Sequence, residues 1–492
     1  MILSVWMRGA VLGVVLAAGA PSNAQEAARP VRYDGHRAVR VTVQTLREYR
    51  TVLALSDDIL TCEGSGIGTF DVRVSPEKYP QLAAAGVRHE VLIPDIQRHV
   101  DQIWADDAAI RAGAGGGAAD DLTWFSTYRS LAEIEARLAT LAGDYNTLAT
   151  LSDIGTSIQN RQIKMIRITG PGSTANRPAF FIQANQHARE WVTPMSAMYI
   201  VDRFLETYGT DPRVTNIVNN VDFYIVPCAN PDGYQYSRTT NSQWRKNRRD
   251  NPGTSCDGVD LNRNWGFQWG YDNTGSSGNP CSETFRGSAG FSEPELTALR
   301  GVADMLGAQG RLKVHWDIHA NAQQILSPWG YTTNPPPHLP LMDQLGLLIH
   351  EGMESIRNTQ YEYGQGSVIL YLNNGNTRDY SYGVHGAMAW TIEMTGSSFQ
   401  PNVSQILPIA QECLAGLMPL AEHYIVPPPP ACYPNCDGST AAPVLNVQDF
   451  GCFLTRYAAG EAWANCDEST VPPVLNVQDF GCFLTKYAAG CP

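Results

Sequence analysis

Four short apolar runs in the middle of this chain each lead to ionisable or amide-bearing side chains, and this pattern constrains the fold more than any other feature. The runs are 179–184, 221–226, 312–318 and 388–392. Amphipathic helical patterns lie among them at 194–208, 293–306 and 404–423, the second with Ser292 and Glu295 at capping-box spacing. Alternation of strands and helices predicts an α/β sheet that is covered on both faces.

The polar residues after these runs predict one site. The runs lead in turn to His187 and Glu190, to Asn230, to His319 and to Glu393. In open α/β sheets, sites form beyond the carboxyl ends of strands, so these side chains are expected to converge. Two histidines and a glutamate with a fourth position left for water form the arrangement of catalytic zinc. Each piece alone has a plainer interpretation, because most His-x-x-Glu tetrapeptides are surface features and most single histidines are core residues.

Residues 1–24 predict an export signal. Arg8 precedes a small, apolar stretch at 9–20, and Ser22-Asn23-Ala24 offers a cleavage site. A membrane anchor is the alternative, but it needs about 20 apolar residues, and no later segment is long enough to span. We therefore expect a secreted protein that is extracellular, periplasmic or surface-attached. The net charge of −13 argues against a nucleic-acid partner.

The region after the signal predicts a small separate domain. Strand patterns lie near 39–43, 70–74 and 89–93, and helical patterns near 45–55 and 77–85. This order predicts an α+β open-faced sandwich at 25–109. A Gly- and Ala-rich stretch at 110–121 predicts a flexible, easily nicked linker, and the large domain then spans 122–426.

The C-terminal region predicts a stapled unit at 432–492, after a proline-rich spacer at 427–431. Residues 444–454 recur as 474–484, which is a tandem repeat with a period of 30 residues. Six of the chain's 11 cysteines lie here. Their spacing favours bridges Cys436–Cys452 and Cys466–Cys482, with Cys432–Cys491 to close the unit, although six cysteines permit fifteen pairings.

The repeats also resemble half of a calcium loop of the dockerin or EF-hand kind, through Asp437-Gly438 and residues 445–450. Ca²⁺ is therefore a candidate ligand. The spacing is longer than in the standard loop, which counts against calcium binding. Attachment to a surface or a protein partner, sorting, and added stability remain alternative roles for this unit.

Ordered motifs of the middle region resemble the zinc metallocarboxypeptidases of the pancreatic A/B type. The motifs are His187-Ala188-Arg189-Glu190-Trp191, Asn230-Pro231-Asp232-Gly233-Tyr234, Trp244-Arg245-Lys246, Asp260-Leu261-Asn262-Arg263-Asn264-Trp265 and Asn279-Pro280-Cys281-Ser282-Glu283. The resemblance covers about 125–424 and, less specifically, an activation propeptide. It implies a mixed twisted sheet flanked by helices, one catalytic Zn²⁺, peptide or protein substrates with a free C-terminus, and a protease that activates the proenzyme near Arg111.

The resemblance also implies a role for each matching residue. His187, Glu190 and His319 would hold the metal, Glu393 would be the general base, and Arg245 would stabilise the oxyanion. Asn262 and Arg263 would clamp the substrate carboxylate, Tyr371 would close over the substrate, Arg189 would line a subsite, and Cys256 would pair with Cys281.

Arg378 occupies the position that the resemblance places at the base of the pocket for the C-terminal side chain. This position is apolar in A-type and acidic in B-type enzymes, so a buried cation predicts a preference for C-terminal Glu or Asp. Neutralisation of Arg378 by Asp379 is the alternative. Two other functions compete with a carboxypeptidase: a zinc amidase that acts on peptidoglycan stem peptides, and a catalytically inactive secreted binding protein.

Overall fold

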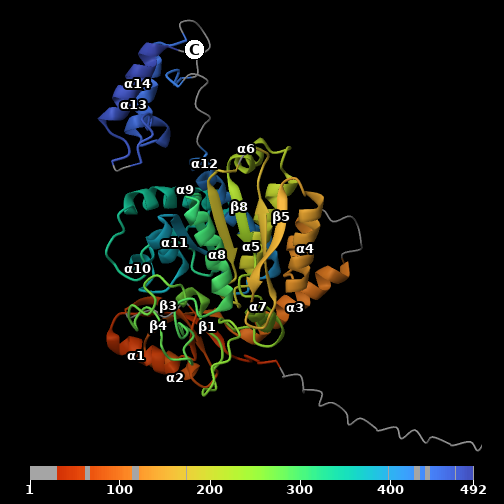
Figure 1. The fold of residues 1–492 in the computed structure, drawn as a ribbon. Helices are drawn as coiled ribbons and strands as arrows, with labels where there is room; N and C mark the ends of the chain where they lie inside the picture. The colour runs from red at the N-terminus through yellow and green to blue at the C-terminus, as the bar shows by residue number, and fades with distance from the viewer. Residues whose placement is uncertain are drawn as a thin grey trace, which may run out of the picture.

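The computed structural model describes residues 30–60, 67–113, 121–172, 174–396, 398–425, 433–437, 444–470 and 473–490. The expected export signal and the expected Cys432–Cys491 bridge lie outside these residues. Figure 1 shows a small N-terminal sheet, a large central sheet with its helices, and a helical C-terminal unit along the chain.

The N-terminal part is an antiparallel sheet with two helices on one face. Strands β1 (Arg37–Val43), β2 (Asp58–Ile59), β3 (Gly68–Val74) and β4 (Arg88–Ile93) lie in the order β2-β3-β1-β4. Helices α1 (Leu46–Leu55) and α2 (Tyr79–Ala84) bury Val52 and Leu82 in one core with the valines of β1. The predicted open-faced sandwich is confirmed.

Helix α3 (Ile96–Gly113) leads from this part to the central domain, and the sequence patterns did not indicate it. Its apolar face buries Ile96 and Ile103. Near its end, Arg111 forms ion pairs with Asp107 at 2.7 Å and with Glu133 at 2.6 Å. Residues 110–113 of the expected linker are therefore helical, and residues 114–120 lie outside the described part of the chain.

The central sheet has the order β11-β10-β12-β9-β7-β8-β6-β5, and its middle strands β12, β9, β7 and β8 are parallel. The outer strands introduce antiparallel pairs, so the predicted mixed sheet is confirmed. The strands are β5 (Ala149–Thr156), β6 (Gln162–Ile168), β7 (Ala179–Ala184), β8 (Asp222–Val226), β9 (Leu312–Ala320), β10 (Gln324–Ser327), β11 (Glu362–Gln365) and β12 (Met388–Met394).

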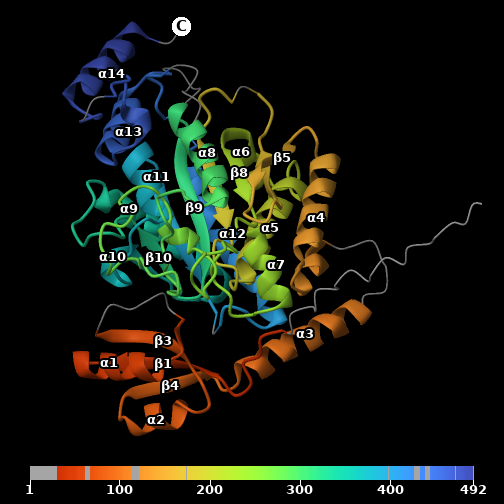
Figure 2. The ribbon, with the colours of Figure 1, turned by 60° about the horizontal axis from the view of Figure 1, so that its bottom comes forward.

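Helices cover both faces of this sheet (Figures 1 and 2). Successive residues of β7 point to opposite faces, so Phe180 and Ile182 join one core whereas Phe181 joins the other. The first core includes α4 (Leu131–Asp144), α5 (Val192–Glu206), α9 (Leu339–Arg357) and α12 (Ile406–His423). The second includes α8 (Pro294–Ala308) and α11 (Thr377–His385). Shorter helices are η1 (Asp121–Ser126), α6 (Pro212–Asn220), α7 (Pro231–Thr239), η2 (Leu261–Arg263), α10 (Gly366–Ile369) and η3 (Val403–Gln405).

The predicted capping box at the start of α8 is wrong. Glu293 is the N-cap residue and makes no capping bond with its side chain. Ser292 Oγ instead donates to Glu293 Oε1 at 2.8 Å, and Glu295 Oε1 accepts from the backbone N–H of Ile158 at 3.0 Å. Glu295 therefore bonds to a tertiary partner instead of closing the capping box.

The C-terminal unit consists of α13 (Val447–Ala458), η4 (Ala462–Ala464) and α14 (Val477–Ala489). The predicted bridges Cys436–Cys452 and Cys466–Cys482 are both present. The rings of Phe453 and Phe483, at equivalent positions of the two repeats, stack at 4.2 Å in the core of the unit. Across the described residues, we find no helix with the length and apolar character that a bilayer crossing requires.

Candidate metal centre and substrate cleft

Two histidines and a glutamate meet at the carboxyl edge of the central sheet. His187 and Glu190 lie in the turn between β7 and α5, and His319 lies near the end of the neighbouring strand β9. Glu190 Oε1 is 2.7 Å from His187 Nδ1, Glu190 Oε2 is 3.2 Å from His319 Nδ1, and the two Nδ1 atoms are 3.0 Å apart. Among the described residues, this is the one group of three such side chains whose ligand atoms could hold a metal ion.

The outer nitrogens of both imidazoles contact carboxylates. His187 Nε2 lies 3.1 Å from Asp260 Oδ1, and His319 Nε2 lies 3.0 Å from Asp317 Oδ2. A carboxylate that accepts the Nε2–H bond fixes the tautomer and turns the Nδ1 lone pair toward the centre. The residues present therefore fit a zinc ion, with two imidazole nitrogens and one carboxylate as ligands.

The electrostatics of the three residues favour a cation. Burial alone would raise the pKa of Glu190, but the two histidines hold this pKa below its ordinary value, so Glu190 is a carboxylate. Burial lowers the pKa of His187, and Arg245 lowers it further. Burial would also lower the pKa of His319, but Asp317 and Glu190 raise it well above the ordinary value. A metal ion would supply the positive charge that this arrangement attracts at His319 Nδ1.

Glu393 lies beside the metal ligands. It pairs in register with His319 across β12 and β9, so both side chains project from the same side of the sheet. His319 and Glu393 lie inside these strands, rather than after them as expected, because both strands run two residues past their predicted ends. Burial raises the pKa of Glu393 to about 7, and Glu190 adds to the effect. A carboxyl group with this pKa can accept and return a proton near neutral pH.

Two arginines approach the same centre from the segment between α7 and α8. Arg245 is buried and donates to Asp260 Oδ2 from Nε at 3.2 Å and from Nη2 at 2.9 Å. Arg263 Nη2 donates to the hydroxyl of Tyr371 at 3.3 Å. Asn262 Oδ1 accepts from the backbone N–H of Thr377 at 3.0 Å, which fixes its amide beside His319. The structure thus brings together the expected clamp residues and the expected mobile tyrosine.

Arg189 contacts the N-terminal part instead of a substrate. Its Nη1 donates to Asp58 Oδ2 of β2 at 2.9 Å, and its guanidinium lies 4.1 Å from the ring centre of Phe399. In addition, Leu60 lines a small cavity together with Tyr371 and Glu393. The N-terminal part therefore covers the cleft.

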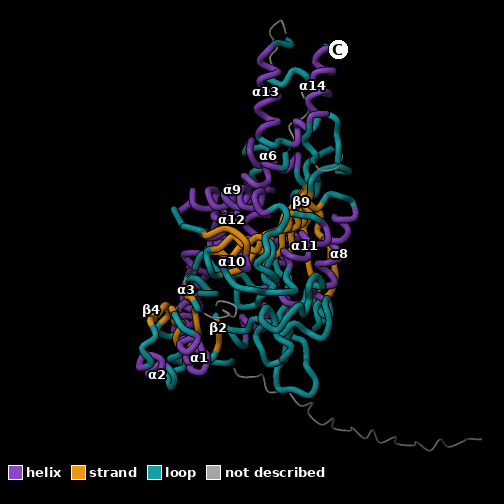
Figure 3. Tube along the Cα trace, turned by 90° about the vertical axis from the view of Figure 1, so that its left-hand side faces the viewer, coloured by secondary structure: helices purple, strands orange, loops and turns teal. Residues whose placement is uncertain are grey.

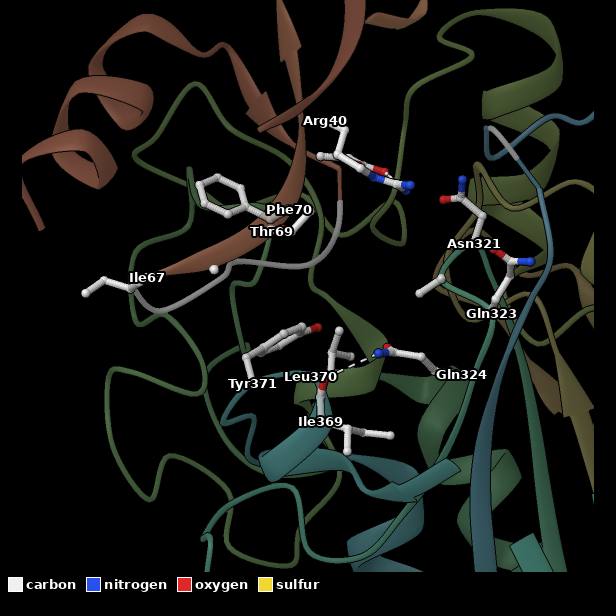
Figure 4. A pocket seen from close by; sticks show the side chains of 13 residues that line it. Arg40, Ile67, Thr69, Phe70, Asn321, Gln323, Gln324, Ile369, Leu370 and Tyr371 are labelled. Atoms are coloured by element: carbon white, nitrogen blue, oxygen red, sulfur yellow. Dashed lines mark hydrogen bonds and ion pairs between the residues drawn. The ribbon is translucent and has the colours of Figure 1, made fainter. Parts of the chain in front are cut away.

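A larger cavity of about 470 Å³ remains between this N-terminal part and the segment of Tyr371. Figure 4 shows Thr69 and Phe70 of β3 on one side of the cavity and Leu370 and Tyr371 on the other. Gln324 Nε2 donates to the carbonyl of Ile369 at 3.3 Å and holds the lower wall.

Arg378 lies in α11, 2% exposed, with neutral hydrogen-bond partners. Its Nη1 donates to Thr391 Oγ1 at 3.1 Å and its Nη2 to Asn373 Oδ1 at 3.2 Å. Burial lowers its pKa, and the nearby charge of Asp379 opposes that shift. Asp379 itself accepts from the backbone N–H of Gly330 at 2.8 Å and forms no ion pair with Arg378 among the described contacts.

Two further expectations concern cysteines and calcium. The predicted Cys256–Cys281 bridge is present. For Ca²⁺, the described residues of the C-terminal unit contain no three acidic side chains whose oxygens lie close enough together to hold one ion. Asp449 and Asp479, each buried, instead close capping boxes at the starts of α13 and α14. Calcium binding therefore finds no support.

A buried metal-ligand set, a neighbouring buried carboxyl group and two arginines at the carboxyl edge of a mixed sheet define a metal-dependent hydrolase. The zinc carboxypeptidase model matches residues 134–416, so this chain belongs to the zinc carboxypeptidase family. It is a zinc metallocarboxypeptidase by that membership and by its relatives.

Carboxypeptidase A1 of Rattus norvegicus is 31% identical over 407 residues, which cover 80% of this chain and 95% of the relative. Metallocarboxypeptidase A of Arthroderma otae is 30% identical over 429 residues, with 85% and 100% covered. Among solved structures, carboxypeptidase A from Helicoverpa armigera superposes with a TM-score of 0.70 at 26% identity, over 80% of this chain and 98% of that one.

Proposed function

We propose that this protein is a secreted zymogen whose catalytic domain removes acidic residues from the C-termini of peptides. The observation that carries the catalytic assignment is the convergence of His187, Glu190 and His319 beside Glu393 at one edge of the sheet. Three disulfides among the described residues support an oxidising compartment, because such bridges persist outside the cytosol.

The catalytic roles follow from the positions of the side chains. Zinc held by His187, Glu190 and His319 would supply Lewis acidity toward water and the scissile carbonyl. Glu393 takes the proton of the attacking water and returns it to the leaving amine nitrogen. Arg245, held in place by Asp260, donates hydrogen bonds to the oxygen on which negative charge develops.

The restriction to a C-terminal residue follows from the clamp. Arg263 and Asn262 bind the free carboxylate of the substrate. A bidentate contact between a guanidinium and a carboxylate is strong and geometrically selective. An internal peptide segment has no carboxylate at this position and cannot make this contact with the buried Arg263. Tyr371, already in contact with Arg263, closes over the bound residue.

The preference for an acidic residue follows from the surroundings of Arg378. A buried guanidinium with only neutral hydrogen-bond partners is costly, and an incoming carboxylate removes that cost. Glycine at positions 366 and 330 makes room for the guanidinium, because a Cβ on Gly366 would lie 2.5 Å from Arg378 Nη2 and one on Gly330 2.8 Å. The same charge repels a lysine or arginine side chain.

The zymogen assignment is supported by the cover over the cleft. Asp58 pairs with Arg189, which we assign to a substrate subsite, and Leu60 lines the small cavity next to Glu393. A bound peptide would compete with both contacts. We propose that residues 25–109 form the activation propeptide and 122–426 the catalytic domain, and that cleavage in the linker at 110–121 permits their separation.

The test compares linker-cleaved protein on peptides that differ only in a final Glu, Phe or Lys, with and without a zinc chelator. We expect release to be sensitive to the chelator and fastest from the peptide that ends in Glu. In Arg378→Gln, the rate advantage of the Glu peptide over the other two should fall about 10- to 100-fold. The control variant Arg300→Gln, at an exposed ion pair on α8, is expected to keep the preference. Fastest release of Phe or Lys by the wild type would contradict the acidic preference. Release from peptidoglycan stem peptides alone would favour the amidase.

A further inference from the structure

Asp317 touches the metal centre but has no role in the function proposed so far. It lies in β9, two residues before His319, so both side chains project from the same face of the strand. Its Oδ2 is 3.0 Å from His319 Nε2, the nitrogen that faces away from His187 and Glu190. Its side chain is fully buried.

The other contacts of Asp317 are amides. Gln183 Nε2 donates to Oδ1 at 3.0 Å, and Gln186 Nε2 donates to Oδ1 at 3.0 Å and to Oδ2 at 2.9 Å. Among the described ion pairs, none joins Asp317 to a lysine or an arginine, and its one ionisable partner is His319. A buried carboxylate without a fixed cation is costly, and a metal ion bound to His319 would offset that cost.

The partner of the second histidine is arranged differently. Asp260 contacts His187 Nε2 at 3.1 Å, but it also accepts two bonds from Arg245. The charge of Asp260 is therefore shared with an arginine, whereas the charge of Asp317 is directed at His319. Of the two carboxylates behind the histidines, Asp317 has more of its charge available to the metal.

Asp317 also connects the metal centre to the substrate clamp. Gln186 Nε2, which bonds Asp317, donates to Thr377 Oγ1 at 2.8 Å, and Thr377 in turn donates to Asn262 from its backbone N–H and its hydroxyl. These contacts form one continuous polar network from His319 to the clamp.

We propose that Asp317 is a positioning residue of the metal centre, which orients His319 through Nε2–H and strengthens its Nδ1 as a zinc ligand. The proposal rests on the zinc set assigned above. Carboxylates in this position typically contribute 10- to 100-fold to metal affinity. Gln183 and Gln186 hold the carboxylate in place without neutralising it.

The test measures zinc affinity by competition with a chromophoric chelator, in the full chain, for the wild type, Asp317→Asn and Asp232→Asn. Asp232 is an equally buried aspartate that bonds Ser157, Gln159 and Arg161 away from the centre. We expect the zinc dissociation constant to rise about 10- to 100-fold in Asp317→Asn and to stay within about threefold of wild type in Asp232→Asn. An unchanged constant in Asp317→Asn, or an equal rise in both variants, would overturn the proposal.

A spectroscopic measurement on the wild type covers the case in which Asp317→Asn does not fold. Proton NMR of the zinc-loaded protein is expected to show two slowly exchanging, far-downfield imidazole N–H resonances, one for each histidine–carboxylate pair. A single such resonance would contradict the Asp317 contact. A wild type that binds no zinc would instead contradict the proposed function, which keeps the two failures distinct.

Discussion

At the amino ends of the parallel strands, one buried carboxylate is surrounded by cations, whereas at the carboxyl ends of the same strands several carboxylates crowd together. Asp222 accepts from Arg167 at 2.8 Å, from Arg177 at 3.3 Å and from Thr169 Oγ1 at 2.6 Å, and it also pairs with Arg311. The loops at the opposite edge gather against the N-terminal part (Figures 2 and 3). There, no described ion pair joins Glu190, Asp317 or Glu393 to a lysine or an arginine. Arg378 has no carboxylate partner among the described contacts.

This difference separates two uses of buried charge. A fully paired charge has its partners within the fold. It matters to stability chiefly because removing one partner of the ion pair is costly. A charge left with too few partners is costly to the fold, and a ligand of the opposite sign removes that cost when it binds. The carboxyl edge is thus suited to a metal ion and an anionic substrate, and the amino edge to stability.

The largest effect is expected from Glu393→Gln at the carboxyl edge. The amide cannot accept the proton of the attacking water, so kcat should fall about 10³- to 10⁴-fold, while the thermal midpoint stays within a few degrees of wild type. Steady-state kinetics on the linker-cleaved protein and thermal unfolding measure the two quantities. A variant that keeps most of its activity would show that Glu393 is not the base.

The opposite pattern is expected from Asp222→Asn at the amino edge. The change leaves three arginines without their shared carboxylate and should lower the free energy of unfolding by about 3–5 kcal/mol. The activity per folded molecule should stay unchanged. Denaturant unfolding combined with active-site titration separates stability from activity. A loss of kcat in the folded fraction would contradict the assignment of the amino edge to stability alone.

A third prediction concerns pH. Glu295, at the start of α8 on the carboxyl side, has a pKa that burial, together with Glu293, raises to about 7. Because this value exceeds the unfolded value of about 4.5, its contribution to stability is present below pH 4.5 and is lost as pH rises through about 7. Glu295→Gln should remove this dependence and stabilise the protein above pH 7 by up to about 3 kcal/mol. Unfolding free energies of the wild type and the variant at pH 4.5, 6 and 8 measure this dependence. Equal pH slopes in the two proteins would contradict the raised pKa of Glu295.

The smallest effect is expected from an ion pair at neither edge. Glu133→Gln removes a partner of Arg111 but keeps a side chain that can complete the capping box with Ser130. A half-exposed pair contributes about 0.5–1 kcal/mol, so cleavage after Arg111 by a trypsin-like protease should speed up two- to fivefold. Asp34→Asn, which loosens the exposed Arg32–Asp34 pair, is the control. Equal rates for wild type and Glu133→Gln would show that this pair does not protect the bond.

Much of the fold could be predicted from local patterns. The runs that gave β7, β8, β9 and β12 are short, apolar and bounded by polar clusters, and each forms a strand within two residues of its predicted bounds. The convergence of His187, Glu190 and His319 could be predicted because parallel strands bring their carboxyl ends to one edge.

Features that depend on tertiary partners could not be predicted. The Ser292–Glu295 capping box failed because Ile158 and Asn264, brought there by the fold, bond to Glu295 and to Ser292 instead. The last turn of α3, at residues 110–113, includes Arg111, which pairs with Glu133, a residue that is distant in sequence. Asp317 did leave a signal, since an Asp-x-His spacing on a strand places both side chains on one face, but a sequence cannot show which nitrogen faces the carboxylate.

The stacked pair Phe453 and Phe483 has a consequence for how the C-terminal unit can be shortened. Both rings are fully buried, and each ring covers the other, so neither repeat has a complete core of its own. A chain that ends after the first repeat would leave Phe453 uncovered, and the nearest equivalent ring would belong to another molecule. We therefore expect the single-repeat form to dimerise, which size-exclusion chromatography would reveal, so that half of the unit would join two enzymes.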